Sequence, residues 1–285
     1  MPQSPAAAPA AAPKVTLGVP VHNGAAHLEK ALESLVCQTL ADIEIVVSDN
    51  ASDDATAEIL RRFAARDGRI RCFRQPALIP IIDNFRFVLE QARAPYFMWA
   101  AHDDTRAPEF VERLWRRLED TPDAVLACGD VVEQVHGQPQ QRSAAFATEG
   151  EPTWARMRKT AAMQCYHIYG LWRTDVLRAI PMAEIPWWPD LPIMVAAAAR
   201  GTFAHVPGVT FFYRFNPKPF FSLVAPGETS TPRKLAKGVR ALAVLVVQSA
   251  RTVSAVAGPG KGALAAWLAF VKSVRQVAGF VGRRI

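Results

Sequence analysis

The chain has 285 residues, which suffice for one large α/β domain with an appendage but not for three domains. Half of the residues are hydrophobic and 21% are charged, which excludes a mostly disordered chain, and the four cysteines lack the CxxC spacing of a zinc knuckle and fit a reducing compartment. The net charge of +7 is confined to one end, because residues 230–285 hold ten Lys or Arg and no acid, whereas the first 229 residues hold 23 basic and 26 acidic side chains.

Apolar strands and amphipathic helices alternate along most of the chain. Residues 1–13, with six Ala and four Pro, lack the features of a secretory signal and predict a flexible leader. The expected strands span 15–21, 43–49, 70–75, 95–104 and 124–132, and the expected helices span 27–38, 54–65, 82–92 and 108–118. After an irregular stretch, two further strands are expected at 202–206 and 209–215. This order indicates an α/β fold with a mainly parallel central sheet flanked by helices.

Polar residues follow three of the predicted strands. The clusters are His22-Asn23 after the first strand, Asp49-Asn50 after the second and His102-Asp103-Asp104 after the fourth. Ligands of parallel α/β sheets bind at the carboxyl ends of the strands, so we expect a ligand site at this edge. No GxGxxG or GxxxxGK[ST] motif follows a strand, which argues against a dinucleotide-binding fold and a P-loop.

Asp103 and Asp104 are adjacent carboxylates at the end of a buried strand. They would repel each other unless a cation neutralised them, and Mg²⁺ or Mn²⁺ takes oxygen ligands from one or two carboxylates together with a diphosphate and waters. The alternative is a solvated loop that caps the helix opening at Pro108. Asp49 has two possible roles. Its carboxylate could accept the imide N–H of a pyrimidine base, or it could stabilise a turn or cap a helix within the segment DNASDD.

The ordered motifs from Val15 to Phe215 resemble the family 2 glycosyltransferases, inverting enzymes that use nucleotide-diphosphate sugars. The family's opening block is similar to VTLGVPVHNGAAHLEKALESLVCQTLADIEIVVSDNASDDAT, with its Pro and Asn after the first strand, its QT and its Asp after the second strand. The approach to the family's metal-binding acidic motif is similar to IIDNFRFVLEQARAPYFMWAAHDD. The resemblance implies a GT-A (nucleotide-diphospho-sugar transferase) fold, which we expect over residues 14–225.

The resemblance also implies roles for individual residues. Asp49 would bind the nucleobase, Asp103 the ribose or a metal-bound water, and Asp104 a Mn²⁺ or Mg²⁺ ion that bridges the diphosphate, with Asp103 as a second metal ligand. Further contacts to the nucleotide sugar are expected from Val21, His22, Asn23, Arg71 and Asn84. For Arg71, an ordinary charge on an edge strand is the alternative.

Inverting transfer needs a base, which in this family stands at the start of a helix well after the metal motif. The segment IPWWPDLPIMVAAAARG places Asp190 there, although it lacks the second acid that the family often has. The resemblance therefore implies Asp190 as the catalytic base, and a plain helix N-cap is the alternative.

The acceptor is expected to contact Trp187, Trp188 and His167. Aromatic faces pack against the apolar faces of sugar rings, and His167 falls, together with Tyr169, where the family places an acceptor-side segment. The alternatives are core packing for the tryptophans and a satisfied structural role for His167. Arg214 is a further candidate for a phosphate contact.

Residues 226–285 predict two basic amphipathic helices broken at Gly258-Pro259-Gly260. Their longest runs without a charge are about ten residues, short of the ~18–20 that span a bilayer. We expect them to lie on an anionic membrane surface, and the alternative is that they pack on the catalytic domain or on a partner subunit. Ala and Val dominate the segment, which argues against nucleic acid as the partner.

These features together predict an inverting, metal-dependent glycosyltransferase that moves a sugar from a nucleotide-diphosphate donor to a saccharide hydroxyl. The expected acceptor is a lipid-linked saccharide of cell-surface polysaccharide biosynthesis, at the cytoplasmic face of the inner membrane, and a homo-oligomer is compatible with the sequence. The alternatives are transfer to a polyprenyl phosphate, and a catalytically silent membrane-associated assembly protein with the same fold.

Overall fold

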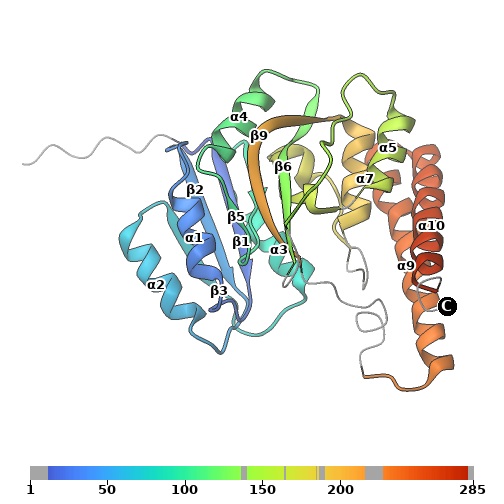
Figure 1. The fold of residues 1–285 in the computed structure, drawn as a ribbon, viewed down its shortest axis with the longest axis horizontal. Coiled ribbons are helices and arrows are strands. Elements are labelled where there is room, and N and C mark those ends of the chain that lie inside the picture. The colour runs from blue at the N-terminus through green and yellow to red at the C-terminus, as the bar shows by residue number, and fades with distance from the viewer. Residues whose placement is uncertain are drawn as a thin grey trace, which may run out of the picture.

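One mixed sheet runs through the centre of the molecule (Figure 1). The computed structural model describes residues 12–135, 140–163, 165–183, 185, 190–215 and 227–281, so nearly all of the expected leader lies outside the described residues. Within them the strands are β1 (Val15–Val21), β2 (Ile43–Asp49), β3 (Ile70–Arg74), β4 (Tyr96–Trp99), β5 (Thr105–Arg106), β6 (Ala124–Val135), β7 (Gln141–Arg142), β8 (Leu171–Arg173) and β9 (Thr202–Phe215). They pair in the order β3-β2-β1-β4-β8-β6-β9-β5, with β7 joined to β6.

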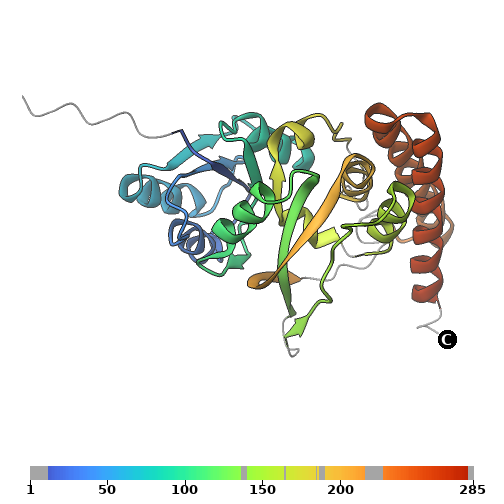
Figure 2. The same cartoon turned by 90° about the horizontal axis from the view of Figure 1, so that it is seen from above.

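Helices cover both faces of this sheet (Figure 2). One face packs against α1 (Leu28–Val36), α2 (Thr56–Arg66) and α4 (Phe110–Glu119). The other face packs against α3 (Ile81–Glu90), α6 (Thr174–Arg178), α7 (Asp190–Arg200) and α5 (Thr153–Ala162), and a 3₁₀ helix, η1, spans Cys165–Tyr169. This arrangement confirms the predicted α/β class.

The parallel strands bring the expected polar clusters to one edge. β1 pairs in parallel with both β2 and β4, and the register sets Val21 opposite Asp49 and Gly18 opposite Trp99. Every residue of β1 and β2 is buried, as expected for parallel strands with helices on both faces. The short strand β8 runs antiparallel between β4 and β6, but each antiparallel pairing in the sheet joins only two residue pairs.

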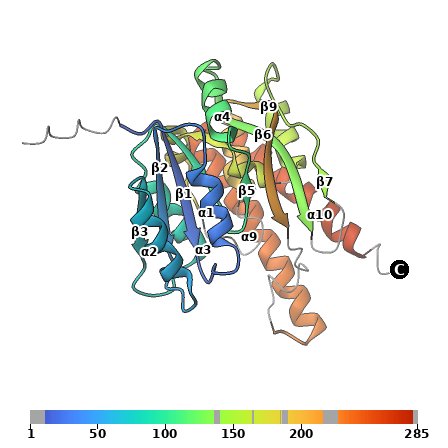
Figure 3. The same ribbon diagram turned by 60° about the vertical axis from the view of Figure 1, so that its left-hand side comes forward.

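The two strands expected at 202–206 and 209–215 are one continuous strand, β9, which lies beside β6 (Figure 3). The register shifts between Cys128 and Asp130 of β6, opposite Pro207 and Gly208 of β9. Proline cannot donate to the ladder, and Gly208 has a φ of 79°, so these two residues form a bulge rather than a break. β9 therefore carries its far end to the carboxyl edge of the sheet.

The C-terminal segment forms a helical hairpin of α9 (Thr231–Ala257) and α10 (Pro259–Val281). The chain reverses at Gly258, whose φ of 90° suits glycine, and α10 approaches α9 so closely at Gly262 that a Cβ there would lie 1.9 Å from Ser254 Oγ. The hairpin packs on α7 and α5 (Figures 1 and 2), and its buried Leu245 and Leu268 belong to the same apolar cluster as those helices. The expected alternative of packing on the catalytic domain is thus observed for one face of the hairpin.

The length of α9 corrects one expectation from the sequence. Residues Pro232–Ala257 form a helix whose best 18-residue window has a mean hydropathy of 1.4, enough in length and composition to cross a membrane. The length of the uncharged runs understates how apolar this helix is. Isolated charges such as Arg251 divide the apolar residues into short runs, but the mean hydropathy over 18 residues stays high. In the fold, 28% of that window is buried against the protein, and core helices of soluble proteins pass the same test.

Candidate active site

The loops that follow β1 and β2 are tied together by hydrogen bonds. His22 Nδ1 donates to the carbonyl of Asn50 over 2.9 Å, and the N–H of Asn23 donates to Ser52 Oγ over 2.9 Å. Asn23 adopts a left-handed backbone with φ of 49°, a conformation that asparagine tolerates better than most residues. Four of the residues expected to contact the nucleotide sugar therefore lie together at this edge: Val21, His22, Asn23 and Asp49.

The carboxylate of Asp49 is buried and fully engaged. Its Oδ1 accepts from the N–H of Ser52 over 3.0 Å, and its Oδ2 accepts from Arg74 Nη1 over 2.5 Å. The side chain of Arg74 is 52% exposed, so the pair has one buried member and one that reaches solvent. A cavity of about 470 Å³ opens beside it, lined by Asp49, Ala57, Leu60, Arg61, Ala64, Cys72, Phe73 and Arg74.

Two other expected nucleotide contacts lie elsewhere. Arg71 forms an ion pair with Glu44 over 2.8 Å, so it has the structural role that was weighed as its alternative. Asn84 is buried in α3, where its Oδ1 accepts from Ser48 Oγ over 2.6 Å and fastens that helix to β2. Arg74, at the end of β3, is the arginine that the fold places beside Asp49.

The acidic motif after β4 is anchored to the end of β9. Asp104 is 1% exposed, and its Oδ1 accepts from the backbone N–H of Arg214 over 2.7 Å. Arg214 Nε in turn donates to the backbone carbonyl of Asp103 over 3.4 Å. The motif thus has a defined orientation, and Arg214, which was expected only as a candidate phosphate contact, lies next to it.

A buried arginine lies beneath this motif. Arg106 stacks on Phe211 at 4.7 Å and donates from Nη2 to the carbonyl of Trp99 over 3.1 Å, while its Nε and Nη1 have no partner within the described residues. Burial lowers the pKa of Arg106 to about 10, opposed by the charge of Asp104. Burial likewise raises the pKa of Asp104 to about 7, opposed by Arg106.

Asp104 meets the requirement of a divalent cation for a carboxylate oxygen. Its Oδ2 is buried and, across the part of the chain that the structure describes, has no hydrogen-bond partner. The described residues contain no group of three or more His, Cys, Asp or Glu side chains that could hold a metal ion. The residues therefore fit an open site, in which one or two carboxylates hold the metal and the ligand's diphosphate and waters complete its shell.

Asp190 begins α7 and faces the same region. Two tyrosines connect it with the acidic motif, because the charges of both Asp190 and Asp104 act on Tyr169 of η1 and on Tyr213 of β9. Burial is the largest cause that raises the pKa of each tyrosine, and the nearby carboxylates raise it further. Burial also raises the pKa of Asp190 to about 6, opposed by the charge of Lys272 from α10.

The residues expected to contact the acceptor differ in where the structure places them. His167 is 4% exposed, and its ring packs between Phe146 at 5.1 Å and Tyr166 at 4.8 Å, so it belongs to the aromatic interior. Trp187 and Trp188 lie outside the described residues. Tyr169 and Tyr213 are the tyrosines on which the charges of both Asp190 and Asp104 act, and the ring of Tyr213 lies 5.7 Å from that of Tyr166.

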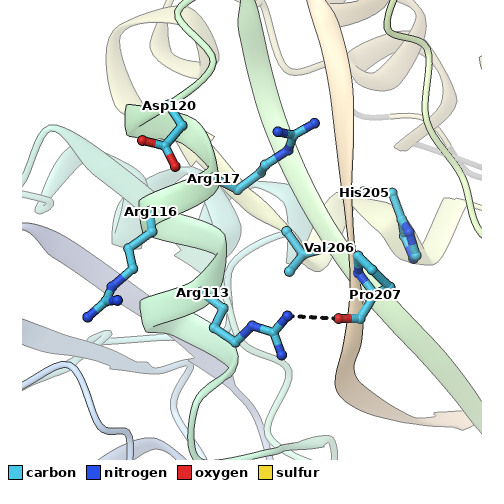
Figure 4. Close-up of a pocket in the computed structure, with 7 residues that line it drawn as sticks. All are labelled: Arg113, Arg116, Arg117, Asp120, His205, Val206 and Pro207. Atoms are coloured by element: carbon cyan, nitrogen blue, oxygen red, sulfur yellow. Dashed lines mark hydrogen bonds between the residues drawn. The ribbon is translucent and has the colours of Figure 1, made fainter.

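A second hollow, of about 530 Å³, lies between α4 and the first half of β9 (Figure 4). It is lined by Arg113, Arg116, Arg117, Asp120, His205, Val206 and Pro207. Arg113 donates to the carbonyl of Pro207 over 3.0 Å, and Arg116 and Arg117 form ion pairs with glutamates. None of the expected site residues lines this hollow, and it lies near the start of β9 whereas Arg214 lies near its end.

Four residues that the structure places near the candidate site were not singled out from the sequence: Arg74, Arg106, Tyr213 and Lys272. Arg74 had a signal, because it ends the strand beside Asp49. Arg106 follows the acidic motif by two residues, but its burial depends on how β5 pairs with β9. The closeness of Tyr213 and Lys272 to Asp190 arises from contacts between distant segments, for which the sequence carries no local pattern.

Comparison with known proteins places these features in a family context. The sequence profile described as Glycosyl transferase family 2 matches residues 16–178. The chain is 31% identical over 117 residues to the uncharacterised glycosyltransferase EpsJ of Bacillus subtilis, over 41% of this chain and 34% of EpsJ. It is 34% identical over 106 residues to the glycosyltransferase GlyA of Streptococcus pneumoniae, over 37% of this chain and 15% of GlyA. The chain thus spans about a third of EpsJ and less of GlyA.

Solved structures share the fold at low sequence identity. S. aureus TarS in complex with UDP-GlcNAc matches with a TM-score of 0.60 and 13% identity, over 85% of this chain and 70% of that one. The mannosyltransferase PcManGT from Pyrobaculum calidifontis, in complex with GDP-Man and Mn²⁺, matches with a TM-score of 0.56 and 16% identity, over 95% and 76%. The fold is the GT-A fold that the sequence predicts.

Proposed function

This chain belongs to glycosyl transferase family 2, and we propose that it transfers a sugar from a nucleotide-diphosphate donor to a saccharide hydroxyl with inversion at the anomeric carbon. One observation supports this proposal most strongly. The charges of Asp104 and Asp190, which come from distant segments of the chain, both act on Tyr169 and Tyr213. The complexes of TarS with UDP-GlcNAc and of PcManGT with GDP-Man support a donor of this chemical class.

Asp190 is the proposed general base. Its carboxylate would accept the proton of the acceptor hydroxyl while the oxygen of that hydroxyl forms a bond to the anomeric carbon and the bond to the diphosphate breaks. With a pKa of about 6, Asp190 is mostly ionised at neutral pH and is a stronger base than an ordinary aspartate. Tyr169 and Tyr213 lie close enough to Asp190 for its charge to act on both of them.

Asp49 and the β1 loop are the proposed nucleotide side of the site. Arg74 holds Asp49 in one orientation, and the hydrogen-bonded loop around Asn23 presents its backbone at the same edge. Asp104, with Asp103, would hold Mn²⁺ or Mg²⁺, which when bound stabilises the charge of the leaving diphosphate. Arg214 lies where its guanidinium could contact a phosphate of the donor.

Replacing the proposed base tests this function. Asp190→Asn should lower turnover by about 10²–10⁴-fold, the usual range for loss of a general base, while the affinity for the nucleotide sugar stays within about twofold of the wild type. Asp175→Asn is the matched control, because Asp175 also stands in the first turn of a helix but is exposed. The assay is nucleotide release over a panel of nucleotide sugars with Mn²⁺ or Mg²⁺, and wild-type turnover in Asp190→Asn would refute the assignment.

The same variants separate the alternatives. Transfer to a polyprenyl phosphate needs no strong base, since the phosphate is already anionic, so an Asp190→Asn protein that is active on that acceptor would favour it. A catalytically silent assembly protein would bind UDP without any dependence on Mn²⁺, which isothermal titration measures directly.

The outer face of the hairpin is the basis for proposing a lipid-linked acceptor of cell-surface polysaccharide biosynthesis and a peripheral position at the inner membrane. Trp267 and Phe270 are more than half exposed, and the segment is strongly basic, a combination suited to an anionic bilayer surface. Since α9 covers α7, deleting the hairpin would damage the core. The cleaner test is flotation with anionic vesicles, in which Trp267→Ser with Phe270→Ser should lose binding and retain the wild-type melting temperature. Unchanged flotation would contradict the membrane assignment.

A further inference from the structure

Lys272 lies on the inward face of α10. The buried residues Ala265, Leu268 and Ala269 form one stripe of this helix, and Lys272 continues that stripe at the i+7, i+4 and i+3 positions. Trp267 and Phe270 mark the opposite, exposed face. Lysine in an apolar stripe requires a polar partner, and Nζ of Lys272 donates to the carbonyl of Met163 after the end of α5.

The inward face of α10 turns this ammonium group toward the layer of α5 and α7, and Asp190 is the first residue of α7. α10 packs against both α5 and α7, and the charge of Lys272 acts on the carboxylate of Asp190 at the start of α7. Leu191 to Ala199 of α7 are buried and uncharged, and the one other charged residue of this helix is the exposed Arg200 at its far end. The other titratable groups that face Asp190 within the described residues are the hydroxyls of Tyr169 and Tyr213, which are neutral at physiological pH.

A carboxylate in such surroundings loses its hydration, and a nearby cation offsets part of that loss. A cation supplied from the solvent-facing side would be screened, whereas Lys272 reaches its position through the protein and is fixed at Met163. Lys272 is therefore the positive charge that the described part of the hairpin contributes near the proposed base.

We propose that Lys272 is a positioning residue for catalysis: its ammonium group holds Asp190 in the carboxylate form that accepts the proton of the acceptor, so that the C-terminal hairpin completes the active site. This inference rests on the proposed role of Asp190. A purely structural role, in which Lys272 only fastens α10 to α5, is the competing explanation and predicts a different response to pH.

The test compares the pH profiles of three variants. Lys272→Met removes the charge with little change in length, Lys272→Arg keeps it, and Lys261→Met removes an exposed charge from the same helix as the control. Because a close opposite charge lowers the pKa of an aspartate by about one unit or more, the acid limb of the kcat profile in Lys272→Met should move up by at least that amount. The variant should then lose about tenfold at pH 5 and approach wild-type kcat at pH 8.5. Lys272→Arg and Lys261→Met should keep the wild-type acid limb.

A second measurement is independent of turnover. In protein with ¹³C-labelled aspartate carboxyls, the resonance absent from Asp190→Asn identifies Asp190, and its titration is followed in the wild type and in Lys272→Met. A higher midpoint in Lys272→Met supports the proposal. An unchanged midpoint, or a loss of kcat that is equal at every pH, would overturn it in favour of the structural role. In a third outcome, the titration midpoint of Asp190 moves in Lys272→Met while Asp190→Asn remains fully active on a saccharide acceptor. That result would refute the proposed role of Asp190 as the base, and with it the catalytic role of Lys272.

Discussion

The affinity of the site for Mn²⁺ should fall as the pH is lowered from 8 to 6, and Asp104 determines this dependence. Burial raises the pKa of this carboxyl to about 7, opposed by Arg106. A metal ion binds the carboxylate form, so binding to the protonated acid must release a proton. About nine-tenths of the acid is ionised at pH 8 and about one-tenth at pH 6, which corresponds to a loss of about tenfold in affinity, or ~1.4 kcal/mol. Affinity rises with pH and levels off above about pH 8, whereas an aspartate of ordinary pKa would give a flat line over this range.

Isothermal titration of Mn²⁺ into protein saturated with a nucleotide sugar measures this dependence. A nucleotide sugar is preferred to free UDP, because the terminal phosphate of UDP ionises near pH 6 and would add its own proton. Repeating the titration at pH 7 in two buffers of different ionisation enthalpy should show the release of about half a proton per metal ion. Asp104→Asn should abolish binding at every pH, and Asp120→Asn, at the exposed end of α4, should not alter it. Equal affinities at pH 6 and pH 8 without proton release would refute the reasoning.

Two further predictions concern binding and stability. Arg74→Met should weaken UDP binding by about tenfold or more, because it removes a charge-assisted hydrogen bond that orients Asp49. Arg71→Met, which removes the ion pair with Glu44, should leave UDP binding unchanged. Titration calorimetry measures both affinities, and equal effects would contradict the placement of Asp49 and Arg74 on the nucleotide side of the site. Leu245→Ala, in the buried stripe of α9, should lower the free energy of unfolding in urea by about 2–5 kcal/mol, and Val247→Ala, on the exposed side, by less than about 0.5 kcal/mol. Similar losses in the two variants would show that α9 does not pack as described.

The sequence predicted the first half of the fold well because burial left a clear pattern. β1 and β2 are covered on both faces, so most of their positions are apolar, and the polar residues that follow each apolar run mark the candidate site. β8 has three residues and pairs with strands distant in the chain, so it carries no periodic signal of its own. β9 was divided in two because Pro207 and Gly208 are breakers in most strands, whereas here they form a bulge opposite β6.

The position of a candidate site residue could be predicted where it depends on the residue's own strand or helix. Asp49 ends β2 and Asp190 begins α7, as expected, whereas Asp104 lies in the connection between β4 and β5 because the strand expected at 95–104 ends at Trp99. Arg71 and Arg74 differ because the choice between them depends on the register of β2 with β3, which aligns Arg74 with Asp49. His167 has the same difficulty, since only the packed aromatic interior shows that its ring is enclosed.

The burial of α7 has a consequence for how the protein is made. Nine consecutive residues, Leu191 to Ala199, are buried, and they are covered in large part by α9, which the ribosome produces later. Strands β1 to β4 and the nucleotide side of the site can assemble on a nascent chain, since elements of a domain's N-terminal part emerge first. The end of the site around Asp190 has to wait for the hairpin. If the proposed function holds, a partly synthesised chain would bind a donor before the hairpin has emerged, and the docking of the hairpin on α7 would then complete the site around Asp190.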